Sequence, residues 1–117
     1  MTTSEIATVL AWHDALNEQD LDTLERLSSD DIEIGNAQGA AQGRDALRQW
    51  ASGLTGEVAV GRMYVREGVV VVEQTGGGID GASAFRVVHD HVTSAFRHAD
   101  IESALAATGL TESDLDA

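Results

Sequence analysis

Hydrophobic side chains recur every three to four residues in the first half of the chain, which is the period of an amphipathic α-helix. The pattern predicts helices over residues 4–19, 21–29 and 44–53. Asp20 stands where the second helix needs an N-cap, and Gly53 ends the third. Between these two helices, the alternation of Ile32 and Ile34 indicates a short strand, and residues 39–43 are expected to form a turn-rich loop.

From residue 57 onward the hydrophobic period changes to the alternation that is typical of β-strands. Runs rich in valine and aromatic residues predict strands over residues 57–66, 69–75, 83–88 and 92–99. Turn-forming residues separate these runs at Glu67-Gly68, at residues 76–81 and at His89-Asp90, and predict hairpins. Helices followed by an antiparallel meander indicate an α+β fold. Residues 101–109 can form a last helix, and the acidic tail, about residues 108–117, is left without predicted structure.

The composition indicates one domain over residues 1–117 and limits the functions open to it. Against 20 acidic residues stand 7 bases, all of them arginine, and the formal charge is −13. Such a charge repels nucleic-acid phosphates and anionic membranes, so neither is expected as a partner. The absence of cysteine excludes disulfides and thiolate metal sites. No apolar run approaches the roughly 20 residues of a membrane span and no signal peptide is evident, so we expect a soluble, cytoplasmic protein.

Three of the four histidines and two aspartates gather in residues 87–100. His89 and His91 flank a predicted turn and have no identifiable third ligand. A metal ion needs about three or four ligands, so no metal site is expected. His98 and Asp100 share one face of the last strand, because side chains alternate along a strand. They either point away from the interior or, with the opposite strand parity, form an acid–base pair inside it.

Three segments, taken in order, resemble the SnoaL-like, nuclear transport factor 2-like superfamily. They are "WHDALNEQDLDTLERLSSDDIEI" at residues 12–34, "GRDALRQW" at residues 43–50 and "HVTSAFRHAD" at residues 91–100. The resemblance implies three N-terminal helices packed on a curved antiparallel sheet, which together form a cone around an apolar pocket. Members of this superfamily include ketosteroid isomerases, polyketide cyclases, epoxide hydrolases and dehydratases, and many others only bind.

The resemblance to ketosteroid isomerase also implies which residues face the pocket. The walls fall on Trp12, Leu16, Val72, Phe85 and Val87, and the polar groups that would orient a ligand fall on Asn36, Gln74, Ser83 and Arg97. The last strand would turn Ala95 and Arg97 inward and His98 outward. The isomerase's base falls on Asn36 and its oxyanion donors on Trp12 and Ser83, so we expect no steroid-isomerase activity.

Two functions stay open after this comparison. The first is a pocket protein that binds a small apolar or ring-containing metabolite; if it is catalytic, it performs a cofactor-independent isomerisation, cyclisation, dehydration or hydrolysis. The second is a non-catalytic binding or interaction module that keeps the fold. For either function, the resemblance implies a homodimer through the convex sheet face, with Phe96 and His98 in the contact.

Overall fold

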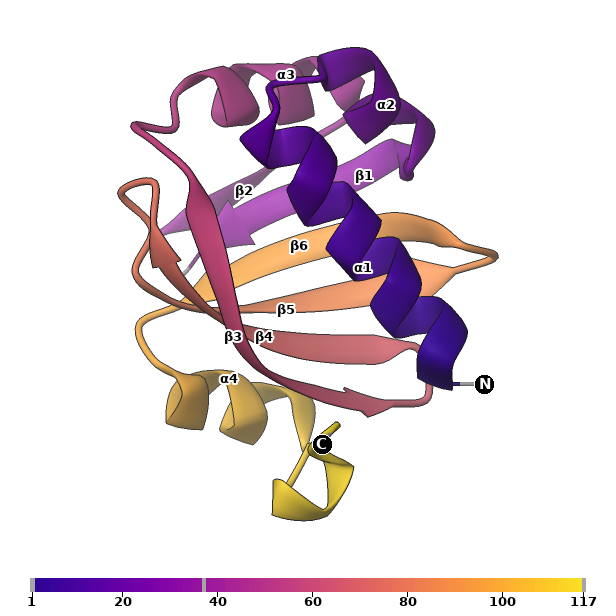
Figure 1. Ribbon diagram of the computed structural model, residues 1–117, viewed down its shortest axis with the longest axis vertical. Coiled ribbons are helices and arrows are strands. Elements are labelled where there is room, and N and C mark those ends of the chain that lie inside the picture. The colour runs from indigo at the N-terminus through magenta and orange to yellow at the C-terminus, as the bar shows by residue number, and fades with distance from the viewer. Residues whose placement is uncertain (1, 37, 117) are drawn as a thin grey trace.

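The computed structural model describes residues 2–36 and 38–116, with side chains from residue 4 onward (Figure 1). The N-terminal half contains α1 (Thr2–Asn17), α2 (Leu21–Arg26), β1 (Ser28–Asn36), β2 (Gly39–Gln42) and α3 (Arg44–Ser52). The C-terminal half contains β3 (Val58–Arg66), β4 (Val69–Gly76), β5 (Gly81–Val88), β6 (His91–His98), α4 (Ile101–Thr108) and a 3-10 helix (Glu112–Asp114). In the described part of the chain, no helix is long and apolar enough to cross a membrane.

The strands form one curved six-stranded sheet in the order β2-β1-β6-β5-β4-β3. The predicted meander of β3 to β6 is confirmed, because each of these strands pairs antiparallel with the next. The sheet is nevertheless mixed rather than purely antiparallel, since β1 runs parallel to β6 with Ile34 opposite Ala95. That pairing joins segments about sixty positions apart in the sequence, so the local periodicity of hydrophobic residues does not predict it.

Two boundaries in the first half were predicted wrongly. The second helix ends at Arg26, and Ser28 already belongs to β1. Residues 39–42 form a strand instead of a loop, although all of them are exposed and small or polar. Gly35 makes this hairpin possible, because a Cβ at that position would lie 2.8 Å from the Cβ of Ala40.

Helices α1, α2 and α3 cover one face of the sheet and enclose the main core (Figure 1). Each contributes fully buried apolar side chains, among them Trp12, Leu24 and Leu47. The Asp20 cap is confirmed, because its carboxylate accepts from the backbone N–H of Thr23 at 3.3 Å. The cone that the resemblance implied is therefore the architecture of this chain.

The C-terminal segment has more structure than the sequence indicated. Helix α4 packs on the opposite, outer face of the sheet, where Ile101 and Leu110 share a second core with Tyr64 and Val71. The Tyr64 hydroxyl donates to Glu112 at 3.1 Å, and Leu115 forms a β-bridge with the same tyrosine. The acidic tail thus lies along β3, with Leu110 buried in the second core and Leu115 paired with Tyr64.

Candidate ligand-binding pocket

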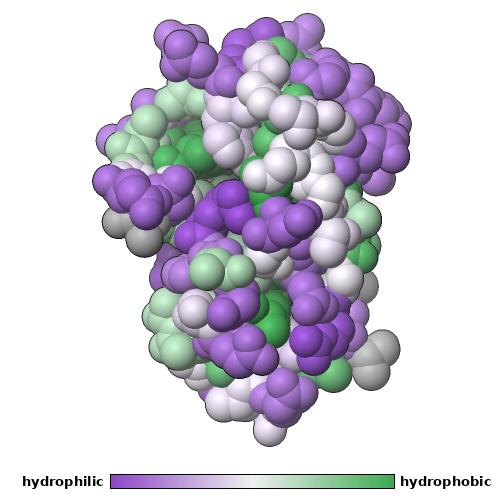
Figure 2. All heavy atoms as spheres, turned by 90° about the vertical axis from the view of Figure 1, so that its left-hand side faces the viewer, coloured by the Kyte–Doolittle hydropathy of each residue, from purple (hydrophilic) through white to green (hydrophobic). Residues whose placement is uncertain are grey.

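The pocket of interest opens at one end of the cone, between the β1–β2 hairpin and α3, and has a volume of about 470 Å³. Figure 2 looks at this end of the molecule and shows a hollow with hydrophobic atoms at its bottom. The lining residues are Ile34, Gly35, Asn36, Gly39, Ala40, Ala41, Ala46, Gln49, Trp50 and Arg97. Five of these are glycine or alanine, so the space exists because small side chains border it.

Trp50 is the aromatic side chain that reaches this pocket. It is partly buried on α3 and stacks on Trp12, with ring centroids 5.7 Å apart and planes at 30°. Trp12 itself is fully buried behind it and donates its indole N–H to the Ser28 hydroxyl at 3.0 Å. The resemblance had implied Trp12 as a pocket wall and had not assigned Trp50 to the pocket.

Aromatic rings fill the interior beyond Trp50. Phe85 meets Trp12 edge-on at 5.2 Å and His13 at 5.4 Å. The aliphatic side chains predicted as pocket walls, Leu16, Val72 and Val87, are buried in the same core. The cone therefore holds a packed interior and an open mouth.

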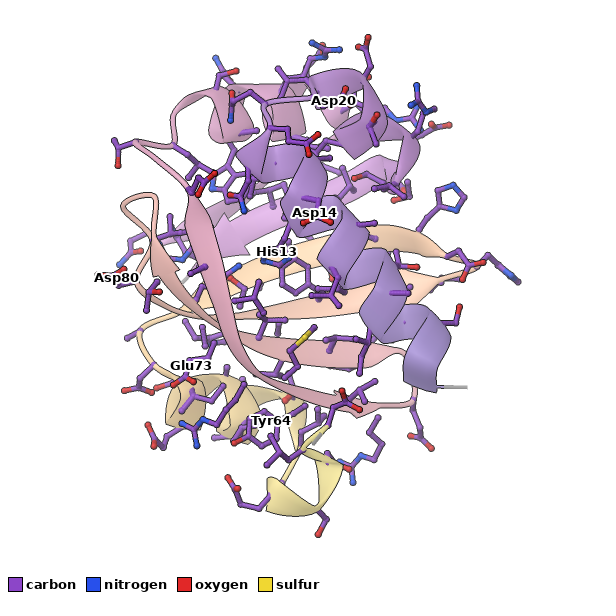
Figure 3. The ribbon with its side chains drawn as sticks, viewed as in Figure 1. His13, Asp14, Asp20, Tyr64, Glu73 and Asp80 are labelled. Atoms are coloured by element: carbon purple, nitrogen blue, oxygen red, sulfur yellow. The ribbon has the colours of Figure 1, made fainter. Side chains whose placement is uncertain are left out.

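A network of buried, hydrogen-bonded polar side chains crosses this interior from α1 to β5. His13 points from α1 toward the sheet (Figure 3), and its Nδ1 lies 2.8 Å from the carbonyl oxygen of Val9. Its Nε2 lies 2.8 Å from Nε2 of Gln74, whose Oε1 accepts from the Ser83 hydroxyl at 2.6 Å. These partners require Nδ1–H to donate and Nε2 to accept, which is the neutral imidazole. Burial lowers the pKa of His13, although the Val9 hydrogen bond opposes that shift.

Arg97 and Asn36 form the polar edge of the pocket. Arg97 donates from Nη2 to the backbone oxygen of Asp80 at 2.9 Å, and its buried Nε has no hydrogen-bond partner. Asn36 accepts from the backbone N–H of Gln38 at 2.9 Å through Oδ1, which leaves its NH₂ group to donate. Among the lining residues, Arg97 carries the one formal charge.

The orientation expected for β6 is confirmed. Ala95 lies in the inner core and Arg97 lines the mouth of the cone, whereas Phe96 and His98 line a groove of about 380 Å³ beside α4. A further hollow of about 600 Å³ lies outside the mouth, bordered by Asn36, Arg97, His98 and Ser103. Over residues 2–36 and 38–116, no group of three histidine, aspartate or glutamate side chains is placed to hold a metal ion.

The structure thus divides the ligand contacts proposed from sequence into two groups. Asn36 and Arg97 line the pocket together. The others are buried in the packed interior: Trp12, Leu16, Val72, Gln74, Ser83, Phe85 and Val87. Which of these residues touch a ligand stays a prediction. Sequence reasoning missed the small residues at 39–41 and 46, and the signal that could have found them is their lack of bulk beside Trp50.

Residues 9–103 match the family model of the SnoaL-like domain. The chain belongs to the SnoaL-like domain family. Solved structures of the same fold agree with this family. One is a nuclear transport factor 2-like protein of unknown function from Cytophaga hutchinsonii, with a TM-score of 0.73 and 14% identity, covering 86% of this chain and 94% of that one.

Two further structures show the same SnoaL-like fold. A nuclear transport factor 2-like protein of unknown function from Burkholderia xenovorans has a TM-score of 0.69, 17% identity and 84% coverage of both chains. An LEH-like epoxide hydrolase from M. tuberculosis has a TM-score of 0.66 and 22% identity, covering 91% of this chain and 92% of that one. No curated protein sequence matches the chain significantly. At these identities the likeness establishes the fold, and function has to be argued from the site.

Proposed function

We propose that this SnoaL-like protein binds a small apolar or ring-containing molecule in the pocket beside Trp50. The observation that carries the proposal is the composition of that pocket: an aromatic face, a border of glycine and alanine, and the three polar side chains of Asn36, Gln49 and Arg97. Ligand sites are typically concave and mostly apolar, with a few polar groups that fix orientation. A volume of about 470 Å³ lies within the usual range for such sites.

The same pocket favours binding over proton-transfer catalysis. Its described lining contains no aspartate, glutamate or histidine, so no side chain there can act as a general base at neutral pH. His13 is enclosed in the core and hydrogen-bonded on both ring nitrogens, away from the lining. We therefore assign the protein to the binding members of its family, with Asn36 and Arg97 orienting the ligand.

Filling the pocket should abolish binding. Ala46→Leu adds three carbon atoms to the α3 wall without removing a core contact. Ser103→Leu adds bulk to the outer hollow instead and is the matched control. Ring compounds that raise the melting temperature of the wild type should do so for Ser103→Leu and fail for Ala46→Leu, since a ligand stabilises only the state that it binds. Loss of binding in Ser103→Leu alone would place the ligand outside the cone and refute the proposal.

We also propose a homodimer through the outer face of β6 and β1, where α4 leaves the sheet uncovered. Paired residues place Arg86, Ser94 and Glu33 in one row across β5, β6 and β1, with Phe96 in the next row. A two-fold axis parallel to β6, between the two sheets, would bring Arg86 of one copy opposite Glu33 of the other and stack the two Phe96 rings. Such self-complementarity is what a two-fold interface requires.

A further inference from the structure

We propose that the ligand is a carboxylate attached to a flat or compact ring, and that Arg97 recognises the carboxylate group. This inference rests on the proposed function, because it names the chemical class that the Trp50 pocket takes. Three observations carry it: the pairing of the arginines, the donor character of the pocket edge and the net charge of the chain.

Arg97 differs from the other arginines in its surroundings. Within the described residues, ion pairs are formed by Arg44, Arg48, Arg62 and Arg66. Of the three arginines outside these pairs, Arg26 and Arg86 are exposed, whereas Arg97 is half-buried. Arg97 forms none, although acids outnumber bases 20 to 7 in the chain and its Nε is buried. Its one hydrogen bond in the described structure goes to a backbone carbonyl. A partly buried guanidinium without an anion is costly, and a ligand carboxylate would supply the missing partner.

The other polar group at this edge is also a donor. Asn36 has its carbonyl oxygen occupied by Gln38 and retains its NH₂ group. Two adjacent donors, one of them charged, match a group with two acceptor oxygens better than a hydroxyl or an amine. The stacked indole of Trp50 and the short side chains of Ala40 and Ala46 leave an apolar slot for the ring that carries the carboxylate.

The charge of the whole chain makes this recognition testable. At a net charge of −13 the protein repels anions in general. If Arg97 had no part in binding, the neutral analogue of an acid would therefore be the tighter ligand. A preference for the anion requires a specific local cation.

The test compares benzoate with benzamide and cinnamate with cinnamamide by calorimetry at neutral pH. The two members of each pair differ in charge and are close in shape. The wild type should bind each acid about tenfold more tightly than its amide, as a charge-assisted hydrogen-bond pair implies. Arg97→Gln should lose this preference while keeping its affinity for the amides. The matched control, Arg26→Gln, removes an exposed arginine on α2 that does not line the pocket, and it should stay within about twofold of the wild type.

Arg97→Lys distinguishes loss of the charged contact from loss of the fold. It keeps a positive charge at this position and should therefore retain part of the preference for the acid over its amide. Equal binding of acid and amide at the Trp50 pocket would overturn the carboxylate inference and leave the proposed function standing. An equal effect of the Arg97 and Arg26 substitutions on the preference for the acid would overturn it too. Failure of every acid and every amide to bind would overturn both.

Discussion

The imidazole of His13 is enclosed by α1, β4 and β5 and keeps its hydrogen bonds only as a neutral ring. A second proton on Nε2 would replace the acceptor that faces the Gln74 amide N–H with another donor. Desolvation of the charged form is the main reason why the pKa of His13 lies below its ordinary value of 6.5. At the residue scale, one buried ring thus links the stability of the fold to pH.

The sign of this linkage follows from the lowered pKa. Below pH 6.5 the unfolded chain binds a proton that the folded chain resists, so stability is complete above that pH and falls as the pH drops toward the folded pKa. At pH 7.5, His13→Gln should be less stable than the wild type by about 1–3 kcal/mol, because the Gln74 and Ser83 network is disturbed. That gap should narrow by up to about 1.4 kcal/mol per pH unit below pH 6.5, since only the wild type has this site to protonate.

Urea denaturation between pH 7.5 and 5 measures this gap directly. The exposed His91→Gln is the matched control, and its difference from the wild type should stay nearly constant. A constant gap for His13→Gln over the same range would contradict the buried neutral imidazole.

At the scale of elements, the sequence predicted the helices and the meander because their apolar residues repeat with a clear period. It failed where structure depends on pairing at a distance. β2 has no alternation to detect, and its strand exists because Gly35 lets the hairpin close. The two tryptophans look equivalent in sequence, since both lie on apolar helix faces. Only the packing of α3 decides that Trp50 reaches the mouth while Trp12 stays inside.

Helix α4 also determines which part of the outer face a second copy can use. It covers β4 and β5 through Ile101 and Ala104 and leaves Phe96 at the edge of the groove beside it. Light scattering after size exclusion should therefore give twice the chain mass at micromolar concentration. Phe96→Asp should give the monomer mass, because it buries two carboxylates at the centre of the proposed interface. The control Leu10→Asp, on the exposed side of α1, should remain dimeric. A monomeric wild type would contradict the proposed dimer.

At the scale of the whole molecule, the cone separates a filled interior from an open mouth. The deep part of the cone is filled by Trp12, Phe85 and His13. Trp50 lies between this interior and the pocket, where a ligand would touch it. The seven arginines are spread over an acidic surface, and the one at the mouth has no anionic partner in the described residues. Different residues therefore stabilise the fold and contact the proposed ligand: the buried residues of the interior do the first, and the residues at the mouth do the second.

The two tryptophans provide the most direct measurement of this division. Each contributes one indole N–H signal to a nitrogen-15 correlation spectrum, and a Trp50→Phe sample assigns them. Titration with cinnamate should move the Trp50 signal progressively to saturation. The Trp12 signal should stay in place, because its N–H is buried on the Ser28 hydroxyl. A titration that moved the Trp12 signal and left that of Trp50 unchanged would show that the ligand enters the interior, and would contradict the pocket described here.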